Sequence, residues 1–135
     1  MTLKRHLAFV QDLLYSRQDI TIEDIFIEEI EPEQAGIIEG RLRFWDVSLL
    51  KFVERVLMYG AVLTKTRYAY HYQDGDNVLV FRYDNVAHHP EIATHPHHKH
   101  LRGDANRGDP VVAASPPSLS DVLREIDEIL YELKS

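Results

Sequence analysis

Hydrophobic residues recur at helical spacing at both ends of the chain. In residues 3–14, and again in residues 119–133, apolar side chains return every three or four positions with charged residues between them. This spacing predicts an amphipathic helix at each end. The second stripe begins just after Ser118 and Asp121, whose spacing is typical of a capping box at a helix start. We therefore expect both helices to bury one face against the rest of the protein.

Between these helices the pattern is that of β-strands. Residues 38–45 alternate between apolar and polar side chains, residues 68–72 place tyrosine at every second position, and residues 20–30 are rich in β-branched side chains. The alternation breaks near Asp24, which indicates a β-bulge or a change of phase. Residues 49–58 fit either a helix or a strand, and their place between two clear strands favours a strand. The predicted strands cover residues 20–30, 38–45, 49–58, 68–72 and 78–84.

An Asp-Gly pair at residues 74–75 predicts a hairpin turn, and this turn fixes which side chains share a face of the sheet. The three tyrosines of residues 68–72 then lie on one face, whereas His71 lies on the other face with Arg82 and Asp84. A face of tyrosines most often forms a core beneath a helix, and we favour that interpretation. A platform on which RNA bases stack is the alternative.

No periodic element is visible in residues 86–117, where five prolines would interrupt one. We therefore expect a long histidine-rich loop over residues 86–117, with a mobile part at residues 102–115. Loops of about 30 residues are uncommon in compact domains and are usually functional or disordered. Together these elements predict a single α+β domain over residues 1–135, in which an antiparallel sheet of about five strands packs with an N-terminal and a C-terminal helix.

Composition narrows the class of protein. The chain has 135 residues, no cysteine, 44% hydrophobic residues and a formal net charge of -7 with neutral histidines. Its length and hydrophobic content fit one globular domain. The acidic charge counts against a broad nucleic-acid-binding surface, although it does not exclude a small basic site. Because the chain has neither a long apolar run nor a signal-peptide pattern, we expect a cytoplasmic protein without a membrane partner.

Six of the eight histidines fall within thirteen residues of the predicted loop, namely His88, His89, His95, His97, His98 and His100. Histidine changes charge near neutral pH, and its neutral ring binds metals, so this cluster suggests either proton transfer or metal binding. Without cysteine, only histidine and carboxylate ligands are available. The spacing matches no sharp metal signature, so we predict no metal cofactor, with a divalent transition metal at the cluster as the alternative.

Proton transfer by histidines suits the cleavage of RNA by its own 2′-hydroxyl. This reaction needs a base, an acid and cations that hold the phosphate, and Arg82 and Lys99 have the charge for the last role. A structural alternative is that Asp84, Asn85 and His88 form a hydrogen-bonded corner that holds the loop to the sheet. That alternative accounts for one or two histidines but not for six.

Six stretches of the chain together form a recognisable set of motifs. They are Gly40-Arg41-Leu42-Arg43-Phe44-Trp45-Asp46, Tyr70-His71-Tyr72-Gln73-Asp74, Phe81-Arg82-Tyr83-Asp84-Asn85, His88-His89-Pro90-Glu91, Pro96-His97-His98-Lys99-His100 and Pro117-Ser118-Leu119. Over about residues 36–130 the chain resembles the TumE-type toxins of bacterial and archaeal toxin–antitoxin modules. This resemblance implies a small prokaryotic toxin that a cognate antitoxin protein neutralises. Two features depart from the family pattern, the histidine at His95 and the long segment 102–109, and we leave both out of the site.

We therefore predict the toxin of a toxin–antitoxin module, acting on RNA and using the histidine loop for acid–base chemistry. Whether the protein is an enzyme stays open at this point, with a metal-independent ribonuclease as the activity that would fit. The alternative is a non-catalytic histidine-rich domain that binds metal or another protein. A homodimer through the broad stripe of the last helix also stays open. The predicted catalytic residues are Asp84, His88, His89, His97, His98 and His100, and the predicted substrate-binding residues are His71, Arg82 and Lys99.

Overall fold

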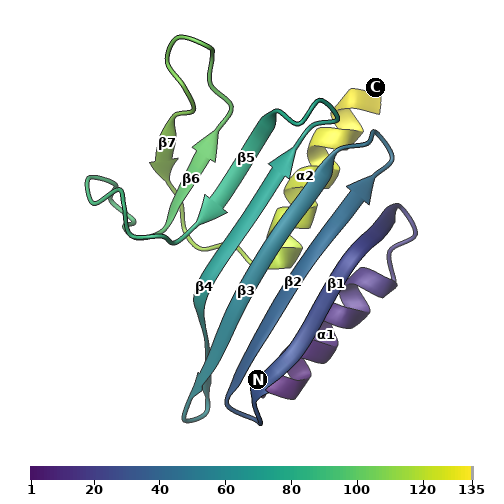
Figure 1. The fold of residues 1–135 in the computed structure, drawn as a ribbon, viewed down its shortest axis with the longest axis vertical. Helices are drawn as coiled ribbons and strands as arrows, with labels where there is room; N and C mark the ends of the chain where they lie inside the picture. Colours follow the sequence, from purple (N-terminus) through teal and green to yellow (C-terminus); the bar gives the residue numbers. More distant parts are fainter. Residues whose placement is uncertain (135) are drawn as a thin grey trace.

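The computed structural model describes residues 1–134 and consists of one antiparallel sheet with a helix at each end of the chain (Figure 1). Seven strands lie in the sheet in the same order as in the sequence, so each strand pairs with the next along the chain. The elements are α1 (Leu3–Tyr15), β1 (Ile20–Glu31), β2 (Ala35–Phe44), β3 (Leu49–Tyr59), β4 (Val62–Gln73), β5 (Leu79–Asp84), β6 (His98–Leu101), β7 (Val111–Ala113) and α2 (Leu119–Lys134).

The α+β class, both helices and the five predicted strands are confirmed. A register shift between Ile22 and Asp24 interrupts the pairing of β1 with β2, where the sequence pattern changes phase. The capping box also forms: the backbone N–H of Asp121 donates to the Ser118 hydroxyl, and the Ser118 N–H donates to the Asp121 carboxylate, both at 3.0 Å. These bonds satisfy two donors that a helix start leaves unpaired.

The prediction for residues 86–117 was wrong, because this segment contains β6 and β7 and the described part of the sheet has seven strands instead of about five. Both strands are short, with four and three residues. The positions of β6 that face away from the helices are His98 and His100, so the strand lacks the apolar alternation that marks a half-buried strand. Mobility of residues 102–115 stays a prediction.

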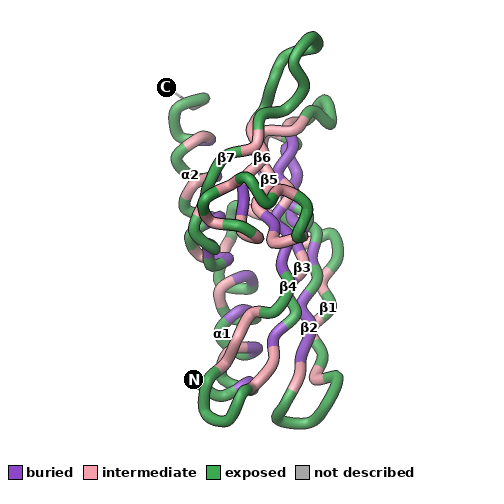
Figure 2. Tube along the Cα trace, turned by 90° about the vertical axis from the view of Figure 1, so that its left-hand side faces the viewer, coloured by how far each residue is buried: buried purple, intermediate pink, exposed green. Residues whose placement is uncertain are grey.

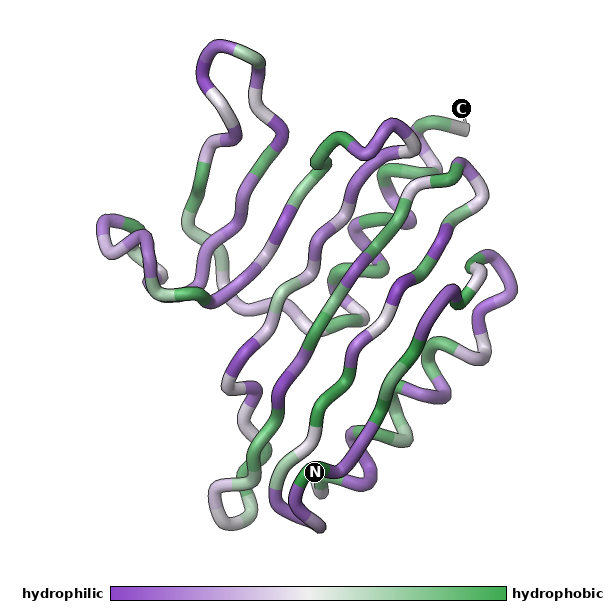
Figure 3. Tube along the Cα trace, viewed as in Figure 1, coloured by the Kyte–Doolittle hydropathy of each residue, from purple (hydrophilic) through white to green (hydrophobic). Residues whose placement is uncertain are grey.

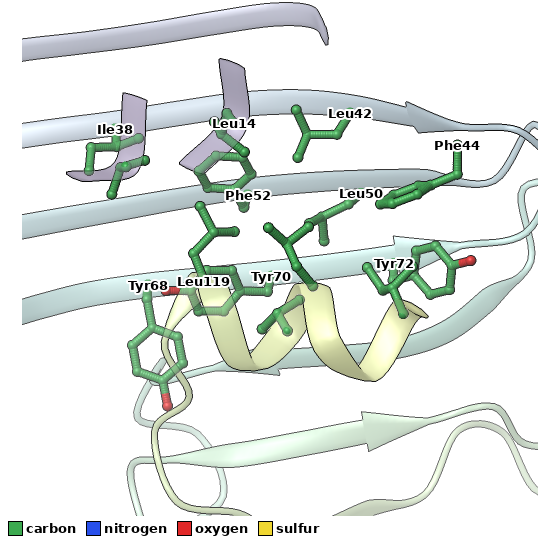
Figure 4. Close-up of a cluster of buried hydrophobic side chains, with 14 of the residues drawn as sticks. Leu14, Ile38, Leu42, Phe44, Leu50, Phe52, Tyr68, Tyr70, Tyr72 and Leu119 are labelled. Carbon is green, nitrogen blue, oxygen red and sulfur yellow. The ribbon is translucent and has the colours of Figure 1, made fainter. Parts of the chain in front are cut away.

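Both helices pack on the same face of the sheet (Figure 2). The tyrosines of β4 lie beneath them, and Tyr68, Tyr70 and Tyr72 are each at most 1% exposed. Figure 4 shows these rings among Leu119 and the apolar residues of β2 and β3. The favoured interpretation is therefore confirmed: the tyrosine face is part of the core beneath the helices. RNA bases cannot stack on it.

The other face of the sheet carries no helix within the described chain (Figure 2). Hydrophilic and hydrophobic residues alternate along β2 to β4, as Figure 3 shows, because successive side chains of a strand point to opposite faces. The apolar set faces the helices and the polar set faces outward, and we call this outward side the open face. Neither helix is long and apolar enough to cross a membrane.

Candidate functional site

Four histidines from two separate segments meet beside the end of β5. His88 and His89 lie in the connection after β5, whereas His98 and His100 lie on β6, which pairs with β5. One ligand nitrogen from each of the four lies within 4.8 Å of the corresponding atoms of the other three. We call these four residues the histidine cluster. The register of β6 brings His98 and His100 to the open face. His98 pairs with Asp84 of β5, and His100 pairs with Arg82 of β5.

The side chains of the histidine cluster pack ring against ring. The ring centroids of His88 and His89 are 4.2 Å apart, and those of His98 and His100 are 4.9 Å apart. The Nε2 atoms of His98 and His100 face each other at 3.1 Å. Two bare lone pairs repel at this separation, so a proton or a metal ion belongs between these nitrogens.

Asp84 lies beneath the histidine cluster and is only 2% exposed. One carboxylate oxygen accepts the backbone N–H of Val86 at 3.0 Å and lies 3.0 Å from Nε2 of His98; the other accepts Nε–H of Arg82 at 3.0 Å and lies 3.6 Å from Nε2 of His100. Burial by itself raises the pKa of Asp84, but the Val86 bond, Arg82 and His98 outweigh it and hold the pKa below its usual value. The carboxylate is therefore charged at neutral pH.

The two ring nitrogens of His98 have different partners. Nδ1 lies 2.8 Å from the carbonyl oxygen of Pro96, which only accepts hydrogen bonds, so Nδ1 carries a proton. In a neutral ring Nε2 then carries the lone pair, and this lone pair faces the carboxylate of Asp84. Because His98 is 1% exposed, water is not available to relieve that repulsion. Either a second proton or a cation must lie at Nε2.

His71 and His100 are held in their neutral forms. The pKa of His71 is lowered by burial and by the positive charges of Arg82 and Lys51. Burial also lowers the pKa of His100; Asp84 opposes this effect without reversing it. At pH 7 both rings are therefore able to accept a proton or another cation.

A row of basic side chains crosses the open face and ends at the histidine cluster. Each member is the direct cross-strand partner of the next, in an unbroken series from β2 to β6. We call this series the open-face row, and it consists of Arg41, Lys51, His71, Arg82 and His100. Its four inter-strand steps of about 4.8 Å span about 19 Å. A shallow hollow of about 420 Å³ lies over the row, with Val53 and Ala69 among its lining residues.

Part of this charge is already paired. Arg41 lies 3.8 Å from Glu23, and Arg82 is bound to Asp84. Lys51 makes no ion pair within residues 1–134 and is exposed. The row therefore offers cations to a ligand on the surface of an otherwise acidic chain.

The structure does not bring all the predicted site residues together. His97 points to the helix-covered side, where its ring stacks on Tyr68 with Nδ1 at 3.0 Å from the tyrosine hydroxyl. Burial, followed by His98 and Lys65, lowers the pKa of His97. Lys99 is on that side as well and donates to Glu125 of α2 at 2.7 Å. The other predicted residues, namely His71, Arg82, Asp84, His88, His89, His98 and His100, share the open side.

Two members of the open-face row, Arg41 and Lys51, were missed in the sequence. Each is an ordinary charged residue at a polar position of an alternating strand. Only the register of β2 and β3 against β4 aligns them with His71. The alternation of side chains along a strand placed His71, Arg82 and Asp84 on one face. The same reasoning, applied to the predicted strand of residues 49–58, would have placed Lys51 on that face too.

Comparison with known proteins identifies the family of the chain. Residues 10–130 match the family described as Toxin TumE. No curated protein and no solved structure matches the chain. The matched range contains every strand, the whole open-face row and the histidine cluster. Because the match covers most of the sequence, the chain belongs to the TumE toxin family.

Proposed function

We propose that this toxin acts on RNA in the cytoplasm, as the partner of a cognate antitoxin protein, and cleaves the RNA at the histidine cluster. The observation that carries the proposal is the open-face row, which leads across the sheet into the cluster. A row of cations suits a chain of phosphates. Imidazoles at its end supply proton transfer near neutral pH.

The proposed reaction is transfer of the phosphate to the neighbouring 2′-oxygen. The 2′-oxygen forms a new bond to phosphorus, and the bond from phosphorus to the 5′-oxygen breaks. A base takes the 2′-hydroxyl proton, and an acid gives a proton to the leaving 5′-oxygen. The products are a 2′,3′-cyclic phosphate and a 5′-hydroxyl.

The contacts of each side chain support a role in this scheme. His100 has a lowered pKa and a direct neighbour, Arg82, that can hold the phosphate beside it, so we assign His100 as the base. His89 and His98 are the groups close enough to return the proton. Asp84 orients the rings through its contacts with His98 and His100. Lys51 and Arg41 hold phosphates farther along the row.

Expression in bacteria tests the proposal, followed by incubation of the purified protein with end-labelled RNA. We expect growth arrest and RNA fragments with cyclic phosphate ends from the native protein. The variant H100A should lose both effects. The matched control is H95A, because His95 is exposed in the same connection but is not part of the cluster.

Circular dichroism confirms that both variants are folded before they are compared. Intact RNA after incubation with the native protein would reject cleavage. Equal loss of activity in H95A and H100A would reject the site. A homodimer stays a prediction, and light scattering measures it.

A further inference from the structure

We propose that His88, His89, His98 and His100 together bind one divalent transition-metal ion. Neutral imidazole nitrogen suits zinc, nickel, copper and iron, and a chain without cysteine has no thiolate ligands to offer. The inference concerns binding and does not rest on RNA cleavage. It replaces the metal-free site that we expected from the sequence with a site that holds a metal ion.

The separations of the ring nitrogens fit a single ion. Two nitrogens that each bind an ion at about 2.1 Å lie about 3.0 Å apart at a right angle and about 3.4 Å apart in a tetrahedron. The Nε2 atoms of His98 and His100 are 3.1 Å apart, between these two values. The largest separation in the histidine cluster is within 4.8 Å. His88 is exposed and His89 is half-buried, so both rings have more room than that of His98 to turn toward such an ion.

In two of the histidines a hydrogen bond at Nδ1 directs the lone pair of Nε2 into the cluster. Nδ1 of His98 donates to the carbonyl oxygen of Pro96 at 2.8 Å, and Nδ1 of His89 donates to the carboxylate of Glu91 at 3.3 Å. In both neutral rings this arrangement leaves Nε2 without a proton and free to bind a cation. Metal-binding histidines typically have such a carbonyl or carboxylate behind them, which fixes the ring and its tautomer.

Asp84 supplies the charge that a buried cation needs. Its Oδ1 atom lies 3.0 Å from Nε2 of His98, so an ion at that nitrogen also lies next to the carboxylate. Nε2 of His98 faces a carboxylate oxygen and another Nε2 in a place that water does not reach. One cation at this point satisfies all three groups, whereas a single proton on Nε2 is shared between two acceptors.

A metal ion would change which group carries the proton in RNA cleavage. Bound at Nε2 of His100, the ion would occupy the lone pair that the metal-free scheme uses as the base, and it would supply Lewis-acid polarisation of the phosphate held by Arg82. The acid–base scheme with free imidazoles and the scheme with metal differ in their response to chelators. Metal binding and RNA cleavage can therefore succeed or fail separately in the same preparations.

The test uses the full chain purified without a polyhistidine tag and stripped with a chelator. Isothermal titration with Zn²⁺ and Ni²⁺ gives the stoichiometry and affinity, and the visible spectrum of the Co²⁺ form reports nitrogen coordination. We expect one ion per chain. The variants H89A and H100A should each bind at least tenfold more weakly, because each removes one ligand. H95A should bind as the native protein does.

Thermal unfolding gives a second measure of metal binding, which also serves for variants that are less stable than the native protein. Zn²⁺ should raise the midpoint of unfolding of the native protein and of H95A by more than that of H100A, because the stabilisation by a ligand grows with its affinity. The proposal is overturned if the native protein binds no ion. It is overturned equally if H95A weakens binding as much as H100A does. Intact RNA after incubation with both the stripped and the metal-loaded protein would reject cleavage and leave metal binding standing.

Discussion

Replacing Lys51 by glutamine should reduce the salt dependence of RNA binding by a calculable amount. The affinity of a protein for single-stranded nucleic acid falls with salt, with a slope of about -0.7 per neutralised phosphate on logarithmic axes. The open-face row contains three permanent cations, Arg41, Lys51 and Arg82, while His71 and His100 are neutral at pH 7. Three phosphate contacts give a slope of about -2.

Between about 50 mM and about 200 mM salt, the native protein should then lose about 18-fold in affinity. With two cations left, K51Q should have a slope of about -1.4 and lose about 7-fold over the same range. Because Lys51 is exposed and makes no ion pair within the described chain, its replacement leaves the fold intact. The change in salt dependence therefore does not come from unfolding.

Fluorescence anisotropy with a labelled 2′-O-methyl oligonucleotide measures these affinities, because a chain without free 2′-hydroxyl groups is not cleaved by the proposed route. The matched control is K4Q, which removes the same charge from the exposed surface of α1 on the helix-covered side. K4Q should keep the native slope. If K4Q and K51Q reduce the salt slope equally, the open-face row is not the binding surface, because only the net charge of the protein would then matter.

Three further predictions follow from contacts elsewhere in the fold. K99Q should keep RNA cleavage and lose up to about 1 kcal/mol of stability in urea unfolding, because Lys99 pairs with Glu125 on the helix side; loss of cleavage would contradict this placement. G40A should destabilise by about 1–3 kcal/mol, because its new Cβ would lie 2.5 Å from the Phe52 ring, and adding F52L should restore part of the loss. Burial raises the pKa of Glu54, but His6, Lys65 and Tyr70 outweigh it, so the folded pKa lies below the ordinary value of 4.5. The contribution of the Glu54 carboxylate to stability is therefore complete above about pH 4.5 and is lost as the pH falls through the folded pKa. E54Q should be about 1–3 kcal/mol less stable than the native protein at pH 7, and this gap should close as the pH falls below 4.5.

Local patterns were enough to predict most of the fold. Both helices, the capping box and the bulge near Asp24 each depend on residues close together in the sequence. Hairpin parity also placed His71, Arg82 and Asp84 on one face, and the pairing of β4 with β5 confirms it. These features were accessible because the side-chain period of a strand and the spacing of a helix are fixed by backbone geometry.

The composition of the histidine cluster was less accessible. Of the adjacent residues 97–100, only His98 and His100 reach the open face, and this selection depends on β6. A strand of four residues with histidine on one side and lysine on the other has no apolar period to reveal it. The sequence therefore grouped Lys99 and His97 with the site, although the alternation of β6 turns both toward the helices.

The register of β6 is what gives the site its chemistry, and the side chains on its other face help to hold that register. A slip by one residue would bring His97 and Lys99 to the open face and turn His98 and His100 toward the core. On the helix side, the Tyr68 hydroxyl is bound to His97 at 3.0 Å, and Glu125 binds Lys99 at 2.7 Å. Both contacts would be lost on slipping, and Asp84 would lose its contacts with His98 and His100 as well. His97 and Lys99 thus add to the stability of the β6 register from the helix side and take no part in the chemistry of the open face.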